Sequence, residues 1–133
     1  MIRLALMTAL FAGLAGAGSA DEPLSVPEFE AYTTGKTLYY GANGNYYGVE
    51  EYLEGRRVRW SFLDGECQEG EWYPAGEMIC FVYEEIGLPQ CWTFYDRSGR
   101  LLARFENNPA STELFETRQS RDPLACLGPK TGV

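Results

Sequence analysis

The most constraining feature of the sequence is a series of short apolar and aromatic runs that begins at Lys36. Turn-forming pairs such as Asn43-Gly44, Asp64-Gly65 and Ser98-Gly99 separate them, at the spacing of roughly 8 to 12 residues that is typical of antiparallel strands. The connections are too short for the crossover helices of a parallel sheet. The runs predict about eight strands, at residues 36–40, 46–53, 57–63, 69–73, 78–84, 90–95, 101–106 and 112–117.

An antiparallel meander leaves two exposed edge strands unless it closes on itself, and closure removes the risk of edge-to-edge aggregation. We therefore expect an all-β fold, an up-and-down meander that forms a small barrel or a strongly curled sheet. Ser25 and Glu28 have the spacing of a capping box, which indicates a short N-terminal helix. The expected organisation is a helical segment at residues 21–35, a β domain at 36–118 and a C-terminal tail at 119–133.

The first 20 residues have the three parts of a secretory signal peptide. Arg3 precedes an apolar run from Leu4 to Ala17, and small residues lie before a cut after Ala20. A membrane anchor is the alternative, but the run is shorter than the ~20 residues that a membrane span needs. The sequence predicts a protein that is periplasmic or secreted after cleavage.

The charge of the chain indicates which partners it favours. The sequence has 11 basic and 19 acidic residues, and cleavage would remove Arg3 and no carboxylate, which leaves 10 against 19 and a net charge of −9. Such a chain repels phosphate backbones and anionic lipid surfaces. We expect no nucleic-acid or membrane partner, and we expect a basic envelope protein or a small ligand instead.

Four cysteines in a small exported chain predict two disulfides. Their spacings of 13, 11 and 35 residues do not suit a four-thiolate zinc site, whose ligands come in closer pairs. A hairpin of residues 78–84 and 90–95, with its turn centred on Glu85-Ile86, would place Cys80 opposite Cys91 at bonding distance. Cys67 would then bond to Cys126 and tie the tail to the sheet, although the other two connectivities remain open.

The middle of the chain contains two linked patterns of glycine, cysteine and aromatic residues: Gly70-x-Trp72-x3-Gly76-x3-Cys80-x2-Tyr83, then Cys91-Trp92-x2-Tyr95-x3-Gly99. This stretch, roughly residues 70–105, resembles small secreted β proteins of Gram-negative bacteria that are classified as domains of unknown function. The resemblance implies an antiparallel β domain of the periplasm. It implies no activity, cofactor or catalytic residue.

Catalytic chemistry has little support in the sequence. The chain contains no histidine, which excludes Ser/His/Asp and Cys/His nucleophilic systems and imidazole-ligated metals. Carboxylate catalysis stays open with Asp64 and Glu66, or Glu69 and Glu71, as candidate pairs, but such residues on a sheet face are usually solvated. No loop offers the oxygen ligands that calcium needs, and we expect no cofactor.

The arginines Arg57 and Arg59 form part of the only dense basic segment of the chain. Their guanidinium groups could bind a carboxylate or a sulfate. The favoured interpretation is cross-strand pairing with glutamates such as Glu50 or Glu71, which contributes little at an exposed site.

The most suggestive candidate site is a group of tyrosines on the first hairpin, which comprises Tyr39, Tyr40, Tyr46, Tyr47 and Tyr52. Tyrosine combines an apolar ring with a polar tip, so tyrosines at a barrel mouth could stack on a sugar or hold a partner's side chain. Core and rim packing is the alternative. Adjacent tyrosines point to opposite faces of a strand, so at most about half of them can line one site.

These observations favour a non-catalytic periplasmic binding domain, for which an inhibitor of a basic extracellular hydrolase such as lysozyme is one form. A second form is a barrel that binds a small apolar or sugar ligand, for which we expect a connected cavity on the order of a few hundred Å³. A carboxylate-based envelope enzyme and a structural protein without a ligand are the remaining alternatives.

Overall fold

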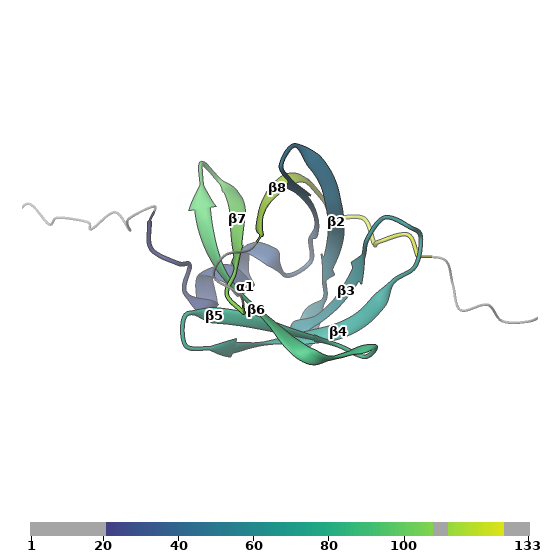
Figure 1. Ribbon diagram of the computed structural model, residues 1–133, viewed down its shortest axis with the longest axis horizontal. Coiled ribbons are helices and arrows are strands. Elements are labelled where there is room, and N and C mark those ends of the chain that lie inside the picture. The colour runs from purple at the N-terminus through teal and green to yellow at the C-terminus, as the bar shows by residue number, and fades with distance from the viewer. Residues whose placement is uncertain (1–20, 108–111, 127–133) are drawn as a thin grey trace, which may run out of the picture.

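The computed structural model describes residues 21–107 and 112–126 as an eight-stranded antiparallel barrel with one α-helix. Each strand pairs with the next in the chain, and β8 pairs with β1 to close the barrel (Figure 1). The strands are β1 (Thr37–Ala42), β2 (Asn45–Tyr52), β3 (Arg57–Ser61), β4 (Gln68–Ala75), β5 (Met78–Tyr83), β6 (Ile86–Arg97), β7 (Arg100–Phe105) and β8 (Glu113–Ser120).

The expected up-and-down meander of eight strands is thus confirmed, and the barrel is closed. Six strands lie within two residues of their predicted bounds at each end, and β6 and β8 differ by more. Strand β6 begins at Ile86 because the hairpin turn lies at Glu84 and Glu85, one residue earlier than expected. A register shift between Phe81 and Tyr83 absorbs the difference. Strand β8 continues to Ser120, which shortens the tail.

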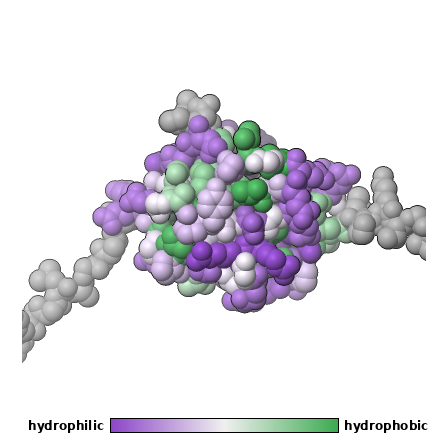
Figure 2. Space-filling view, turned by 90° about the horizontal axis from the view of Figure 1, so that it is seen from below, coloured by the Kyte–Doolittle hydropathy of each residue, from purple (hydrophilic) through white to green (hydrophobic). Residues whose placement is uncertain are grey.

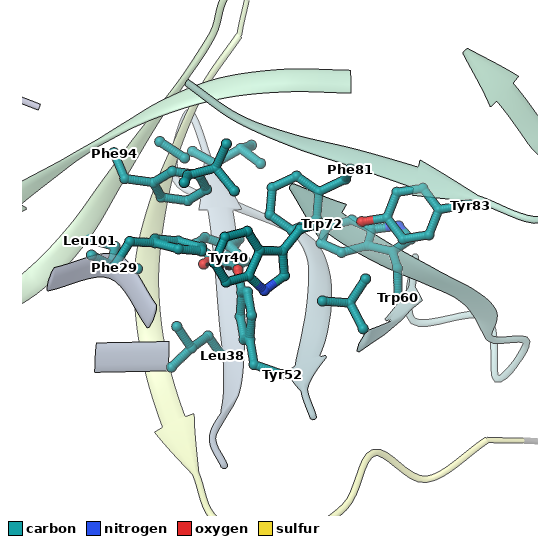
Figure 3. Packing of buried hydrophobic residues seen from close by; sticks show 14 residues of the cluster. Phe29, Leu38, Tyr40, Tyr52, Trp60, Trp72, Phe81, Tyr83, Phe94 and Leu101 are labelled. Atoms are coloured by element: carbon teal, nitrogen blue, oxygen red, sulfur yellow. Dashed lines mark hydrogen bonds between the residues drawn. The ribbon is translucent and has the colours of Figure 1, made fainter. Parts of the chain in front are cut away.

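Helix α1 (Val26–Thr33) begins at the predicted capping box. The Glu28 amide donates to Ser25 Oγ at 3.3 Å, and the Ser25 amide donates to Glu28 Oε2 at 2.8 Å. The helix places Phe29 inside one end of the barrel, fully buried, with its ring 4.5 Å from the ring of Phe94 and 5.2 Å from that of Trp72. Phe29 therefore closes this end, as the packing in Figure 3 shows.

The two ends of the barrel differ because successive strands run in opposite directions. Helix α1 leads into the start of β1, at the end that also carries the turns after β2, β4 and β6. The opposite end carries the connections after β1, β3, β5 and β7, and we call it the mouth. Its described loop residues are 43–44, 62–67, 84–85, 106–107 and 112.

Both disulfides join the expected cysteines. Cys80 and Cys91 lie directly opposite each other on β5 and β6, with their Cα atoms 4.0 Å apart. Cys67 in the mouth bonds to Cys126 in the tail, with Cα atoms 5.6 Å apart. Disulfides of this kind are typical of oxidising compartments outside the cytoplasm.

The predicted signal peptide at residues 1–20 and the last residues of the tail, 127–133, lie outside the described residues. Within the described part of the chain, no helix is long and apolar enough to cross a membrane.

Candidate ligand-binding site

Side chains fill most of the barrel interior and leave a cavity of about 50 Å³. Its lining includes Phe62 and Ile86, which flank mouth connections, so the cavity opens toward the mouth. This volume is smaller than the few hundred Å³ expected for a ligand barrel. Since one water needs about 10–15 Å³, the cavity has room for about four water-sized groups. It suits a head group or the tip of a side chain.

Strand alternation places Glu50 in this cavity. Gly48, Glu50 and Tyr52 occupy alternate positions of β2 and share the inner face of the barrel. The absent side chain of Gly48 leaves space for Trp60 of β3, since a Cβ at this glycine would lie 2.2 Å from the Trp60 ring. The close approach of the Trp60 ring thus fixes one wall of the cavity.

The carboxyl group of Glu50 is the most unusual feature of the cavity. Glu50 is 1% exposed, and its Oε1 accepts a hydrogen bond of 2.9 Å from the Tyr83 hydroxyl. Oε2 has no hydrogen-bond partner among the described residues, and neither has the buried Oε1 of Gln68, which lines the same cavity. Two hydrogen-bond acceptors in one cavity are therefore unsatisfied.

The surroundings of Glu50 favour its protonated form. Burial raises the pKa of Glu50 well above its ordinary value, and the hydrogen bond from Tyr83 opposes this effect only in part. None of the described residues that line the cavity is basic. Glu50 thus lacks the cationic partner that a buried carboxylate normally has.

The buried tyrosines beside Glu50 are neutral hydrogen-bonding groups. The hydroxyls of Tyr40 and Tyr52 lie 2.8 Å apart and share a hydrogen bond. Burial raises the pKa of Tyr40, Tyr52 and Tyr83 well above that of a solvated phenol. In Figure 3, Tyr83 and Trp60 lie on the side of the core away from Phe29.

Aromatic rings form the cavity wall nearest the mouth. The ring of Trp60 lies 5.3 Å from that of Phe62 and 5.9 Å from that of Tyr47, as measured between centroids. Phe62 is 51% exposed at the entrance. Trp92 lines the cavity from β6 and packs against Phe105.

The structure divides the predicted tyrosine group between two sites. Tyr40, Tyr47 and Tyr52 line the cavity, whereas Tyr39 and Tyr46 line a separate hollow on the outer face of the barrel. In that hollow the Arg118 guanidinium lies 4.8 Å from the centre of the Tyr39 ring. Simple alternation would put Tyr47 and Tyr52 on opposite faces of β2, and the register shift between Tyr40 and Gly41, which leaves Tyr47 without a partner in β1, interrupts that alternation.

The predicted arginines lie away from the cavity. Arg59 pairs with Glu69 at 2.6 Å and with Glu51 at 3.3 Å. Arg57 is exposed and lies opposite Glu71 in the strand register. The expectation that Glu50 pairs with an arginine is wrong, because barrel closure turns Glu50 inward and its neighbour Glu51 meets Arg59.

The candidate catalytic carboxylates do not line the cavity. Asp64, Glu66, Glu69 and Glu71 are all exposed. Asp64 accepts a hydrogen bond from the Glu66 amide within its own turn, and Glu69 pairs with Arg59. The residues that the structure describes contain no group of three or more side chains suited to hold a metal ion.

A second buried carboxylate, Glu116 of β8, has a structural role. It accepts hydrogen bonds from the Tyr32 hydroxyl at 2.7 Å and from the Leu101 amide at 2.8 Å. These contacts join α1, β7 and β8. Glu116 therefore holds the helix to the barrel, in contrast to the incompletely bonded Glu50.

The rim of the mouth is acidic. Asp64 and Glu66 follow Phe62 in one loop, and Glu84 and Glu85 form the turn between Tyr83 and Ile86, so both segments adjoin residues that line the cavity. All four carboxylates are exposed. On the face in Figure 2, hydrophobic residues form separate patches among hydrophilic ones.

Comparison of the chain with protein-family models, curated proteins and solved structures finds no match. The site must therefore be interpreted from its own geometry.

Sequence reasoning did not identify Glu50, Gln68 or Tyr83 as site residues. A signal for Glu50 was present, because it lies two residues before Tyr52 and so shares its strand face. Which face is inward depends on barrel closure, which brings Tyr83 from β5 to Glu50 on β2. That contact spans 33 residues of sequence.

Proposed function

We propose that the protein is a non-catalytic binding protein of the periplasm or the extracellular space, and that it binds its ligand in the mouth of the barrel. The proposal rests mainly on one observation. The cavity contains two buried oxygens without a hydrogen-bond partner, Glu50 Oε2 and Gln68 Oε1. Such atoms are rare in native proteins, and each costs about 1–3 kcal/mol. A ligand that donates hydrogen bonds to both atoms explains why they are retained.

The proposed location rests on the signal-peptide pattern of residues 1–20 together with the two disulfides. The non-catalytic role is supported by the positions of the candidate catalytic carboxylates, which are exposed and do not line the cavity.

The three tryptophans allow a direct test by NMR. Trp60 and Trp92 line the cavity, whereas Trp72 packs on Phe29 at the helix end and serves as an internal control. We expect some members of a panel of small amines, alcohols, sugars and carboxylic acids to shift the indole N–H signals of Trp60 and Trp92 and to leave that of Trp72 unchanged.

A variant that fills the cavity provides the control for this test. Ala103 lines the cavity, so Ala103→Leu should abolish the shifts. Ala75→Leu adds the same volume at the helix end of β4, outside the cavity, and should preserve them. The proposal fails if no compound in the panel shifts Trp60 and Trp92, or if Ala103→Leu leaves the shifts intact.

The acidic rim favours a second candidate, an inhibitor of a basic hydrolase such as lysozyme. Opposite charges on two surfaces speed association and are sensitive to salt. We expect immobilised lysozyme to retain the protein at low salt, and the double variant Glu84→Lys/Glu85→Lys to lose this retention. Glu54→Lys/Glu77→Lys makes the same charge change at the helix end. Equal loss in both variants would argue against docking through the mouth.

A further inference from the structure

We propose that the cavity around Glu50 binds a primary ammonium group on an unbranched alkyl chain, carried either by a free amine or by a lysine side chain of a basic protein. This inference rests on the proposed function and names the chemistry of its ligand.

The first argument is the kind of polar atom that the cavity presents. The unsatisfied atoms, Glu50 Oε2 and Gln68 Oε1, are both oxygens that accept hydrogen bonds. An ammonium group has three N–H donors and no acceptor, so it has donors for both oxygens. Beside an ionised Glu50, a single hydroxyl can donate only one hydrogen bond and would leave the other oxygen unpaired. A carboxylate or phosphate would meet acceptors only.

The second argument is charge. Among the described residues that line the cavity, Glu50 is the only acidic group and no side chain is basic. The ionisable groups that face it are phenols: Tyr40 on β1, Tyr47 and Tyr52 on β2, and Tyr83 on β5. The other inward carboxyl is Glu116 on β8, which Tyr32 and Leu101 engage. A cation in the cavity would therefore be the missing partner of an ionised Glu50.

The third argument is the aromatic wall. Trp60, Phe62 and Tyr47 form mutual ring contacts at the entrance, and Trp92 lies on another wall. Ring faces carry negative charge density and attract cations, most strongly when water is excluded. The same rings pack against methylene groups. An ammonium with an alkyl chain matches both properties, and the volume of about 50 Å³ admits the ammonium with a short length of chain.

The fourth argument is the path into the cavity. The loop with Asp64 and Glu66 and the turn of Glu84 and Glu85 flank the entrance. A rim of carboxylates raises the local concentration of cations and repels anions. Rim and cavity thus select for the same sign of charge.

Binding of an ammonium group beside Glu50 is coupled to the release of the Glu50 proton. Burial raises the pKa of Glu50 well above its ordinary value and so favours the protonated form in the empty cavity. An alkylammonium ion enters already charged, so Glu50 must ionise to pair with it. The carboxyl proton then leaves to solvent, and the complex releases about one proton for each ligand bound. Affinity should rise by up to about tenfold per pH unit while Glu50 of the free protein stays protonated.

The test is isothermal titration calorimetry of the oxidised protein with n-butylamine hydrochloride. Titrations in two buffers of different ionisation heat give the number of protons released. We expect binding with release of about one proton, and no binding of 1-butanol or butyrate. Glu50→Gln keeps the shape of the side chain but cannot ionise, and should weaken butylammonium binding by about tenfold or more. The matched control Glu71→Gln, on the outer face of β4, should leave affinity unchanged.

The source of the ammonium is distinguished with lysozyme and with lysozyme whose lysines are converted to homoarginine, which keeps the positive charge but replaces the ammonium. Loss of lysozyme binding after conversion, and competition by butylammonium, would identify a lysine side chain. Binding of butylammonium without competition from lysozyme would identify a free amine.

Two results overturn the ammonium proposal and leave the proposed function intact: tight binding of a neutral alcohol or sugar in the cavity, or butylammonium binding that Glu50→Gln does not weaken. If no compound of the panel and no basic protein perturbs Trp60 and Trp92, both the ammonium proposal and the proposed function fail.

Discussion

The proton on Glu50 makes a specific prediction about stability. In the folded protein, burial raises the pKa of Glu50 well above the value of 4.5 that applies in the unfolded chain. Below pH 4.5 both states hold the proton. Above it, the unfolded chain releases the proton and the folded protein retains it, so rising pH favours unfolding. The stability present below pH 4.5 is lost as pH rises toward the pKa of the folded protein.

The magnitude follows from the buried position of the group. Each pH unit between the two pKa values lowers the free energy of unfolding by about 1.4 kcal/mol. The side chain is 1% exposed, so solvent screens little of this effect. The loss continues to grow with rising pH until the pKa of the folded protein is reached.

The perturbation is Glu50→Gln, and the assay is urea denaturation at pH 4.5, 5.5 and 6.5 with both disulfides intact. Other carboxylates also titrate, so the quantity of interest is wild type minus variant. We expect this difference to fall as the pH rises above 4.5, by at most about 1.4 kcal/mol per pH unit. Glu71→Gln, at an exposed position on the outer face of β4, serves as the matched control. A constant difference for Glu50→Gln would refute a buried, protonated carboxyl at this site.

Three further variants test the fold. Phe29→Ala should lower the free energy of unfolding by about 3–5 kcal/mol in urea, because it empties the closed end of the barrel; a loss comparable to a surface substitution would contradict this. Cys67→Ser with Cys126→Ser opens a loop of 59 residues and should cost about 4 kcal/mol by the same measurement, and an unchanged midpoint would show that the tail is held without the bond. Gly48→Ala should displace the Trp60 ring, with a change in near-ultraviolet circular dichroism and a loss of about 1–3 kcal/mol; an unaltered spectrum would rule out the close packing.

The disulfide-linked hairpin could be predicted because the residues that determine it lie close together in the sequence. Cys80 and Cys91 lie 11 residues apart, and strand alternation together with a short turn is enough to oppose them. The turn itself was misplaced by one residue. The structure places it at Glu84 and Glu85, and the register shift between Phe81 and Tyr83 restores the same cysteine pair.

The cavity was harder to predict because the residues that form it lie far apart in the sequence. The alternation of β2 puts Glu50 on the same face as Tyr52, but it does not say that this face is inside. That assignment needs the closing contact between β1 and β8 and the plug formed by Phe29. Glu50 and Glu51 are also adjacent and identical in type, so composition alone could not separate the buried acid from the one that pairs with Arg59.

The most direct test of the central claim is the ¹³C NMR signal of the Glu50 side-chain carboxyl, followed through a pH titration with and without butylammonium. Because burial raises the pKa of Glu50 well above its ordinary value, we expect the carboxyl of the free protein to titrate above the ordinary range of a glutamate, and to titrate at lower pH when butylammonium is bound. A Glu50 that titrates in the ordinary range in the free protein, or whose titration does not move when the amine is bound, would contradict a cavity built to pair with a cation.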